Sequence, residues 1–145
     1  MPSRATVRAI ARGLGAIYGR PRLGNPRDPL DDLVYVMIST MTTAPSYRRV
    51  YASLKSRFRT WDEADRARLR TLVRLLAPAG LSGVKSRALK RVFSHLRAAF
   101  GSATLAPLRK RSTENAEAFL TTLPGVGVKT ARCVLMYALG RQVFP

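Results

Sequence analysis

Apolar residues recur along most of this chain at spacings of three and four positions, with polar residues between them. That spacing is typical of amphipathic α-helices, which turn one apolar face toward a core. It predicts helices over 1–20, 30–41, 45–58, 61–67, 68–77, 84–100, 112–122 and 128–139. No segment shows the sustained alternation that half-buried strands require, and no repeat of fixed length is evident. We therefore expect an all-α fold.

The faces of three predicted helices carry specific expectations. The first has an apolar stripe beside an arginine stripe, formed by Val7, Ile10, Leu14 and Ile17 and by Arg4, Arg8 and Arg12. The segment 30–41 is apolar nearly all round after an acidic first turn, which is typical of a buried helix. In 84–100 the stripe expected to face the core consists of Val84, Ala88, Val92, Leu96 and Ala99. Ser3 and Thr60 are the expected N-caps of their helices.

Proline and glycine interrupt the pattern most strongly at 19–29, where three prolines and two glycines occur in one stretch. This composition predicts a loop. The stretch is too short to separate two independent cores, so 145 residues are expected to form a single domain.

Charge adds the first indication of a partner. The chain has 26 Lys and Arg against 8 Asp and Glu, a formal net charge of +18, and no acidic residue lies between Arg66 and Arg111. A positive field of this size repels itself unless a polyanion neutralises it, which favours nucleic acid. A membrane surface is less favoured because no helix combines a basic face with a bulky aromatic one.

Cysteine usage and hydropathy bear on the compartment. Cys133 is the single cysteine, which leaves no internal disulfide and no multi-cysteine metal site. No apolar run approaches the ~20 residues of a membrane span, and no long apolar segment follows the first basic residues. We expect a cytoplasmic protein, associated with the nucleoid if it is bacterial, and no membrane partner.

The stretch "TLPGVGVKTAR" (122–132) carries the most specific candidate chemistry. A helix ending at Thr122, a glycine-bearing turn and a helix from Val128 describe a helix-hairpin-helix. Gly125 and Gly127 permit positive φ and a close approach by another backbone. The amides that begin the second helix lack intrahelical partners and favour phosphate binding. The alternative is an ordinary turn between helices. For Lys129 the residues alone leave three roles open: a solvated side chain, a phosphate clamp or a nucleophile.

Three motifs resemble the endonuclease III family, the helix-hairpin-helix DNA glycosylases of base excision repair. "LPGVGVKTARCVLMYALG" (123–140) resembles the family's hairpin and following helix, and this match is highly specific. "MISTMTTAPSY" (37–47) and "AGLSGVKSRAL" (79–89) are similar to its two loops that enter DNA. The resemblance implies a six-helix barrel with a hairpin. Its parts are a leading helix at 1–20, a barrel at 30–122 and the hairpin at 116–140.

The same resemblance implies roles for individual residues. Lys129 corresponds to the lysine that attacks the sugar C1′ of a flipped nucleotide and forms a Schiff base that permits β-elimination. An amine attacks only when neutral, a form favoured by the positive end of its helix, desolvation and the surrounding positive field. Leu81 corresponds to the wedge, and Met41 stands where the family usually carries glutamine. Core packing is the alternative for both. The remaining implied DNA-binding residues are Leu123, Gly125, Val126, Gly127, Val128 and Thr130.

Two parts of the family pattern are missing from the sequence. An aspartate that assists base loss is expected two positions past Pro145, and four cysteines beyond it hold a 4Fe-4S cluster in many members. We therefore expect a truncated product or a fragment without the C-terminal cluster domain. With one cysteine, no cofactor is expected in this chain.

The resemblance, together with the basic charge, implies a base excision repair DNA glycosylase and AP lyase that acts on damaged DNA. The expected partner is duplex DNA with a damaged base or an abasic site, bound by a monomer. Lyase action on an abasic site is favoured over excision of an intact base, because excision depends more on the missing aspartate. The alternatives are a non-catalytic DNA-binding module and, less favoured, a general basic protein that coats nucleic acid.

Overall fold

Helices account for all the regular secondary structure in residues 1–19 and 23–145, the part of the chain described by this computed structural model. No strand occurs in these residues, which confirms the predicted all-α class. The helices are α1 (Arg4–Tyr18), α2 (Pro29–Ser39), α3 (Ala44–Arg57), α4 (Trp61–Arg66), α5 (Leu69–Leu76), α6 (Ser82–Phe100), α7 (Thr113–Thr122) and α8 (Val128–Tyr137). Two short 3₁₀ helices were not predicted: η1 (Ala77–Ala79) lies between α5 and α6, and η2 (Ala106–Lys110) lies between α6 and α7.

Side-chain caps begin several of the helices. The Ser3 side chain accepts a hydrogen bond from the Thr6 amide, and the Thr60 side chain accepts one from the Glu63 amide. Both residues are the predicted N-caps. Each cap satisfies one of the amides that a helix leaves without a partner at its start.

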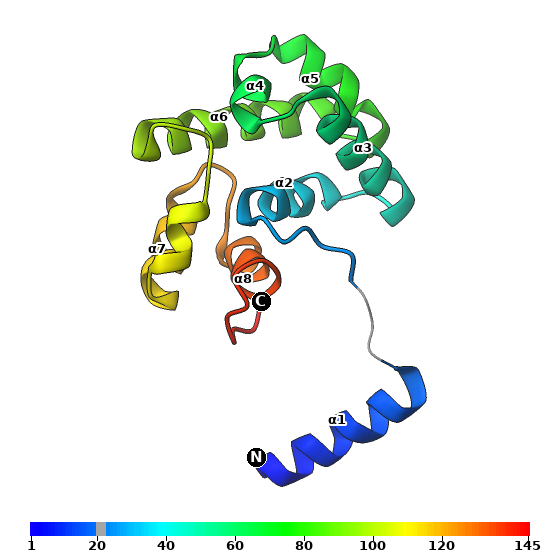
Figure 1. Cartoon of the computed structure of the whole chain (residues 1–145). Helices are drawn as coiled ribbons and strands as arrows, with labels where there is room; N and C mark the ends of the chain where they lie inside the picture. Colours follow the sequence, from blue (N-terminus) through cyan, green and yellow to red (C-terminus); the bar gives the residue numbers. More distant parts are fainter. Residues whose placement is uncertain (20–22) are drawn as a thin grey trace.

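Helix α2 occupies the centre of the fold. Figure 1 shows it between the group α3–α6 and the pair α7 and α8, and it packs on α3, α6 and α8. Its buried apolar residues include Leu30, Leu33, Val34 and Ile38, as expected for the segment 30–41. Burying a side chain of this size contributes about 1.5–3 kcal/mol, so a helix buried nearly all round fixes the elements on each side of it.

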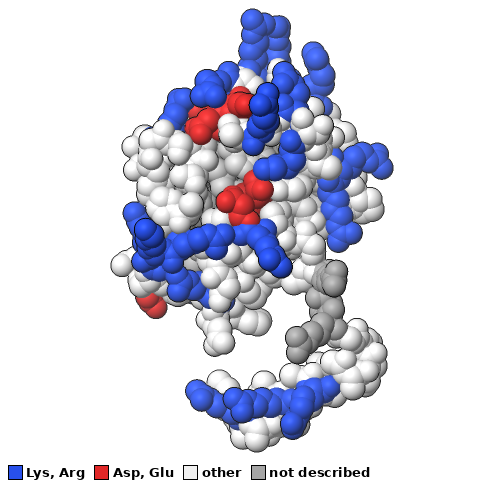
Figure 2. Space-filling model, viewed as in Figure 1, with Lys and Arg blue, Asp and Glu red and all other residues white. Residues whose placement is uncertain are grey.

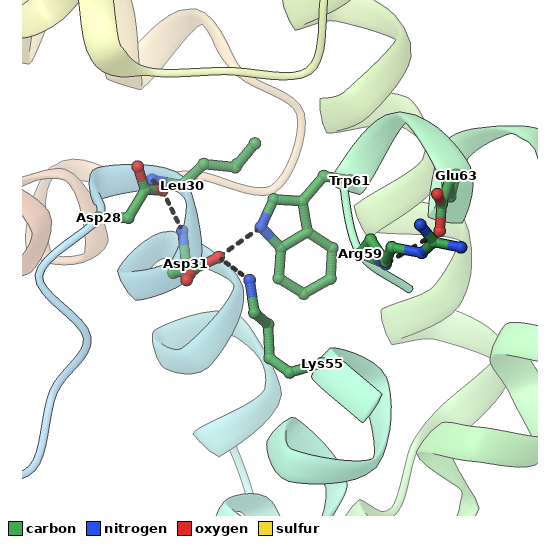
Figure 3. A network of polar contacts seen from close by, with 7 residues as sticks. All are labelled: Asp28, Leu30, Asp31, Lys55, Arg59, Trp61 and Glu63. Carbon is green, nitrogen blue, oxygen red and sulfur yellow. Dashed lines mark hydrogen bonds and ion pairs between the residues drawn. The ribbon is translucent and has the colours of Figure 1, made fainter. Parts of the chain in front are cut away.

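The acidic first turn of α2 also joins α3 and α4 through Asp31 (Figure 3). The Trp61 indole Nε1 donates to Asp31 Oδ1 at 2.6 Å, and Lys55 Nζ lies 3.0 Å from the same oxygen. The Trp61 ring stacks on Phe93 of α6, with ring centroids 5.5 Å apart. Trp61 is therefore an anchor for the core.

Helix α1 stands apart from this core in Figure 1. None of its residues is buried, and its apolar stripe of Val7, Ile10, Leu14 and Ile17 is exposed. Lys and Arg side chains follow its length and are scattered over the rest of the surface in that view, among many uncharged residues (Figure 2). No helix among the described residues combines the length and apolar character needed to cross a membrane.

The predicted face of α6 is confirmed at Val92 and Leu96, which are buried, and is wrong at Val84 and Ala99, which are exposed. Val84 was expected in the core but is 59% exposed, whereas Lys85 and Ser86 are buried beside the apolar Leu89 and Val92. The helix begins at Ser82, and its first turn places Lys85 inward because backbone carbonyls are available there to accept from its ammonium. A pattern based on apolar residues alone cannot detect a buried lysine.

Candidate DNA-binding and catalytic site

The predicted hairpin is present between α7 and α8. The Val126 amide donates to the Leu123 carbonyl at 3.1 Å and closes the turn. Gly125 has φ of 78°, a conformation that favours glycine. Gly127 differs from expectation because its φ is −88° and its ψ is 176°, an extended conformation open to any residue. Only Gly125 of the two therefore needs to be glycine for the turn itself.

Burial divides the hairpin residues into two groups. The side chains of Leu123 and Val126 are 2% and 6% exposed and anchor the turn in the core. Gly127, Val128 and Lys129 are exposed, and Thr130 is partly buried. Any contact between DNA and the first two residues would thus involve their backbone.

The exposed edge of the turn leaves room for a partner. Helix α8 begins at Val128 with Gly127 as N-cap and without a side-chain cap, so its first amides point outward. A Cβ added at Gly127 would meet nothing within 4 Å. A Cβ at Gly125 would lie 3.8 Å from the Ala88 Cβ. The surface at Gly127 is therefore open, whereas Gly125 faces α6.

Arginines border the groove between α6 and the turn. A shallow cavity of about 180 Å³ is lined by Arg87 and Arg91 of α6 together with Pro124 and Gly125. Both arginines are exposed. Their charges and the outward amides of α8 provide a surface suited to an anion.

Lys129 lies on the wall of a larger cavity of about 510 Å³. The walls come from α2, α3, α8 and the segment before α2, and include Asn25, Tyr35, Ser39, Tyr47, Lys129, Thr130, Cys133 and Tyr137. Aromatic rings and a few polar groups in a concave space of this size are typical of a ligand pocket. This pocket was not predicted from the sequence, because its walls come from segments far apart in the chain.

Three tyrosines support the pocket from α2 and α3. Tyr35 makes edge-on contacts with Tyr47 and Tyr51, with ring centroids 5.1 Å and 5.2 Å apart. Burial raises the pKa of the Tyr35 hydroxyl, and the Arg48 guanidinium opposes that rise. Of the three, Tyr35 and Tyr47 line the pocket, and Tyr47 is the more exposed ring available to a planar ligand.

Asp32 is a buried acid close to the same pocket. Its side chain is inaccessible, and Asn25 Nδ2 donates to its Oδ1 at 2.7 Å. Its other oxygen has no hydrogen-bond partner among the described residues. Burial raises the pKa of Asp32 to about 6, and burial together with Asp32 raises the pKa of the Cys133 thiol. Asp32 is therefore a buried carboxyl group beside the pocket, although it belongs to the first turn of a helix.

Met41 and Leu81 both lie in loops with unusual backbone geometry. Their φ values are 56° and 49°, and among the described residues they alone are non-glycine residues with positive φ. Met41 is 82% exposed and Leu81 55% exposed, so neither has the alternative core role. Exposed apolar side chains on such loops are suited to insertion between bases.

In 1–19 and 23–145, no three His, Cys, Asp or Glu side chains come close enough to hold an ion. A 4Fe-4S cluster requires several thiolates, and Cys133 is the single cysteine of the chain. The residues present do not fit such a cluster.

Comparisons with known proteins place these features in context. No family model matches the chain. Over 116 residues it is 34% identical to an Arabidopsis thaliana protein named "Putative DNA glycosylase", an alignment that covers 80% of this chain and 40% of that protein. The chain thus spans about two fifths of the length of this relative.

Solved structures resemble it over nearly its whole length. A trapped covalent intermediate of endonuclease III with DNA has a TM-score of 0.75 at 22% identity, covering 97% of this chain and 62% of that one. A thermostable thymine-DNA glycosylase has a TM-score of 0.76 at 20% identity, covering 97% of this chain and 61% of that one. A Helicobacter pylori 3-methyladenine DNA glycosylase bound to 1,N6-ethenoadenine has a TM-score of 0.73 at 16% identity, covering 94% of this chain and 65% of that one.

Proposed function

We propose, on the premise that this chain has the fold of endonuclease III and related helix-hairpin-helix DNA glycosylases, that it acts in base excision repair as a DNA glycosylase and AP lyase. The observation that carries this proposal is the position of Lys129. Its side chain is exposed at the start of α8 and lines a pocket of about 510 Å³ beside the hairpin. A nucleophile at this position can reach a nucleotide that is flipped out of the duplex into the pocket, while the neighbouring hairpin holds the DNA phosphates.

The hairpin supports a grip on the DNA backbone. The outward amides at the start of α8 and the open surface at Gly127 accommodate a phosphate. Arg87 and Arg91 border the same turn and add positive charge. This grip is independent of base sequence, because it uses phosphates alone.

The pocket supports binding of an extruded nucleotide. Tyr35, Tyr47 and Tyr137 offer ring faces or edges, while Asn25 and Ser39 offer polar groups to an unpaired base. Met41 and Leu81 enter the duplex and occupy the space that the nucleotide leaves. Methionine fills space but forms no strong hydrogen bond with an orphaned partner base, so discrimination at that base is weak.

Lys129 then performs the covalent step. On an abasic site, its neutral amine condenses with the C1′ aldehyde, forms a C–N double bond and releases water. Loss of a C2′ proton moves electrons toward the Schiff base and breaks the bond to the 3′ phosphate, which leaves. On a damaged nucleotide, the amine displaces the base from C1′, and the base departs with the electron pair and a proton. The sugar ring then opens to the same Schiff base.

Borohydride trapping tests the proposal on a duplex with one abasic site. Wild-type protein is expected to form a covalent adduct, and Lys129→Ala is expected to form none while still binding the duplex. Retained binding without an adduct in the wild type would identify a non-catalytic DNA-binding module. An adduct in Lys129→Ala would assign the nucleophile to another amine.

A further inference from the structure

Lys85 is buried at a junction between two loops. It lies in the first turn of α6, is 6% exposed, and donates from Nζ to the Ile38 carbonyl at 2.9 Å and the Ala79 carbonyl at 2.8 Å. Ile38 belongs to the last turn of α2 and precedes Met41 by three residues. Ala79 precedes Leu81 by two residues. One ammonium group therefore joins the two segments that lead to these exposed apolar side chains.

The loops it joins hold conformations that need support. Positive φ is unfavourable for Met41 and Leu81, because both carry a Cβ. Such conformations persist where surrounding contacts fix them, and they concentrate at functional sites. The Lys85 amide also donates to the Leu81 carbonyl at 2.9 Å, which adds a second attachment to the same loop.

A lysine is an unfavourable choice at a buried position unless its donors are used. Burial lowers the pKa of the Lys85 ammonium, and no described carboxylate forms an ion pair with it. An apolar residue would continue the buried face of Leu89 and Val92 with less desolvation. What lysine adds is a donor group able to reach two carbonyls at once.

We propose that Lys85 is a positioning residue that fixes the Met41 and Leu81 loops relative to each other, so that both side chains enter damaged DNA as one unit. The inference rests on the proposed function, since it assumes that these side chains insert into the duplex. Lys85 itself touches neither the reacting atoms nor the DNA. Lys85 thus affects the recognition of the lesion, and it does not affect the binding of backbone phosphates by the hairpin.

Lys90 provides a matched control on the same helix. Its Nζ also donates to two backbone carbonyls, those of Asp65 and Ala67, the second at 2.7 Å. These carbonyls lie at the end of α4, away from the two loops. Lys90→Met thus removes the same kind of contact from the same helix without releasing either loop.

The test compares affinities for an intact duplex and for the same duplex with one abasic site, at one salt concentration. In Lys85→Met, the preference for the abasic duplex is expected to fall about tenfold, with affinity for intact duplex unchanged. In Lys90→Met the preference is expected to stay at the wild-type value, while thermal stability falls in both variants. Equal preference in the two variants would overturn the inference. A wild type with no preference would overturn the proposed function and this inference with it.

A double-mutant cycle tests the coupling with Lys85 in place, and so does not depend on folding of the Lys85 variant. Met41→Ala and Leu81→Ala are measured singly and together for preference toward the abasic duplex. If the two loops act as one unit, the losses of preference for the abasic duplex should be non-additive. The double variant should then lose less preference than the product of the two single effects. Additive losses would mean that the loops act independently and would contradict the inference.

Discussion

Asn25 donates a hydrogen bond of 2.7 Å to Asp32 Oδ1, and this bond ties the segment before α2 to a fully buried carboxyl group. The second carboxyl oxygen has no hydrogen-bond partner among the described residues. Because burial disfavours the charged form more strongly than one amide donor favours it, the pKa of Asp32 rises to about 6 from 3.8. An acid held in this way makes stability depend on pH.

Asp32→Asn is expected to remove that pH dependence. The folded state binds the Asp32 proton more tightly than the unfolded state, so the stabilisation is fully present below pH 3.8 and is lost as pH rises through about 6. The full shift corresponds to about 3 kcal/mol. Urea unfolding at several pH values between 4 and 7.5 should show the variant gaining stability relative to wild type as pH rises. Parallel profiles for the two proteins would contradict the expectation.

Trp61→Ala is expected to cost about 3–5 kcal/mol, because it opens a cavity against Phe93 and leaves the Asp31 carboxylate with fewer donors. Lys55→Ala removes the other group that contacts Asp31 Oδ1, but that lysine is on the surface. It should cost about 1 kcal/mol or less. Urea denaturation of both variants measures the difference, and equal losses would argue against Trp61 as the anchor.

The two hairpin glycines should respond differently to alanine. At Gly125, φ of 78° makes Gly125→Ala strained, and we expect a loss of about 1 kcal/mol or more in unfolding free energy. At Gly127 the backbone is extended and the space around a Cβ is open, so Gly127→Ala should leave thermal stability close to wild type. The methyl group added by Gly127→Ala lies where a phosphate is proposed to approach, so the affinity of this variant for duplex DNA should fall. Unchanged affinity in Gly127→Ala would argue against a backbone grip at this turn.

Arg87→Ala and Arg91→Ala should each weaken binding to intact and abasic duplexes by the same factor. Both side chains border the groove beside Pro124 and Gly125, where they contact phosphates in the proposed complex. Each substitution is expected to reduce the slope of log affinity against log salt by about one unit. Arg70→Ala on α5, outside that groove, serves as the control. A change in lesion preference instead of overall affinity would show that these arginines act at the lesion.

The sequence by itself determined the helices and the hairpin. Their signals are local: apolar spacing, the caps Ser3 and Thr60, and the glycine turn that ends at Val128. Each depends on residues within one or two helical turns, and each is present in the structure. The resemblance to endonuclease III depended on three continuous motifs, of which the hairpin motif at 123–140 is the most specific.

Only the tertiary structure decided what surrounds Lys129 and which polar groups are buried. The pocket joins Tyr35 of α2 and Tyr47 of α3 to α8, and no local pattern encodes that meeting. Lys85 was missed for the same reason. A lysine is placed on the solvent face unless acceptors for its ammonium are known, and one of them, the Ile38 carbonyl, lies 47 residues away in sequence. Burial of a charged group depends on partners supplied by the whole fold, whereas the period of a helix depends on its own residues.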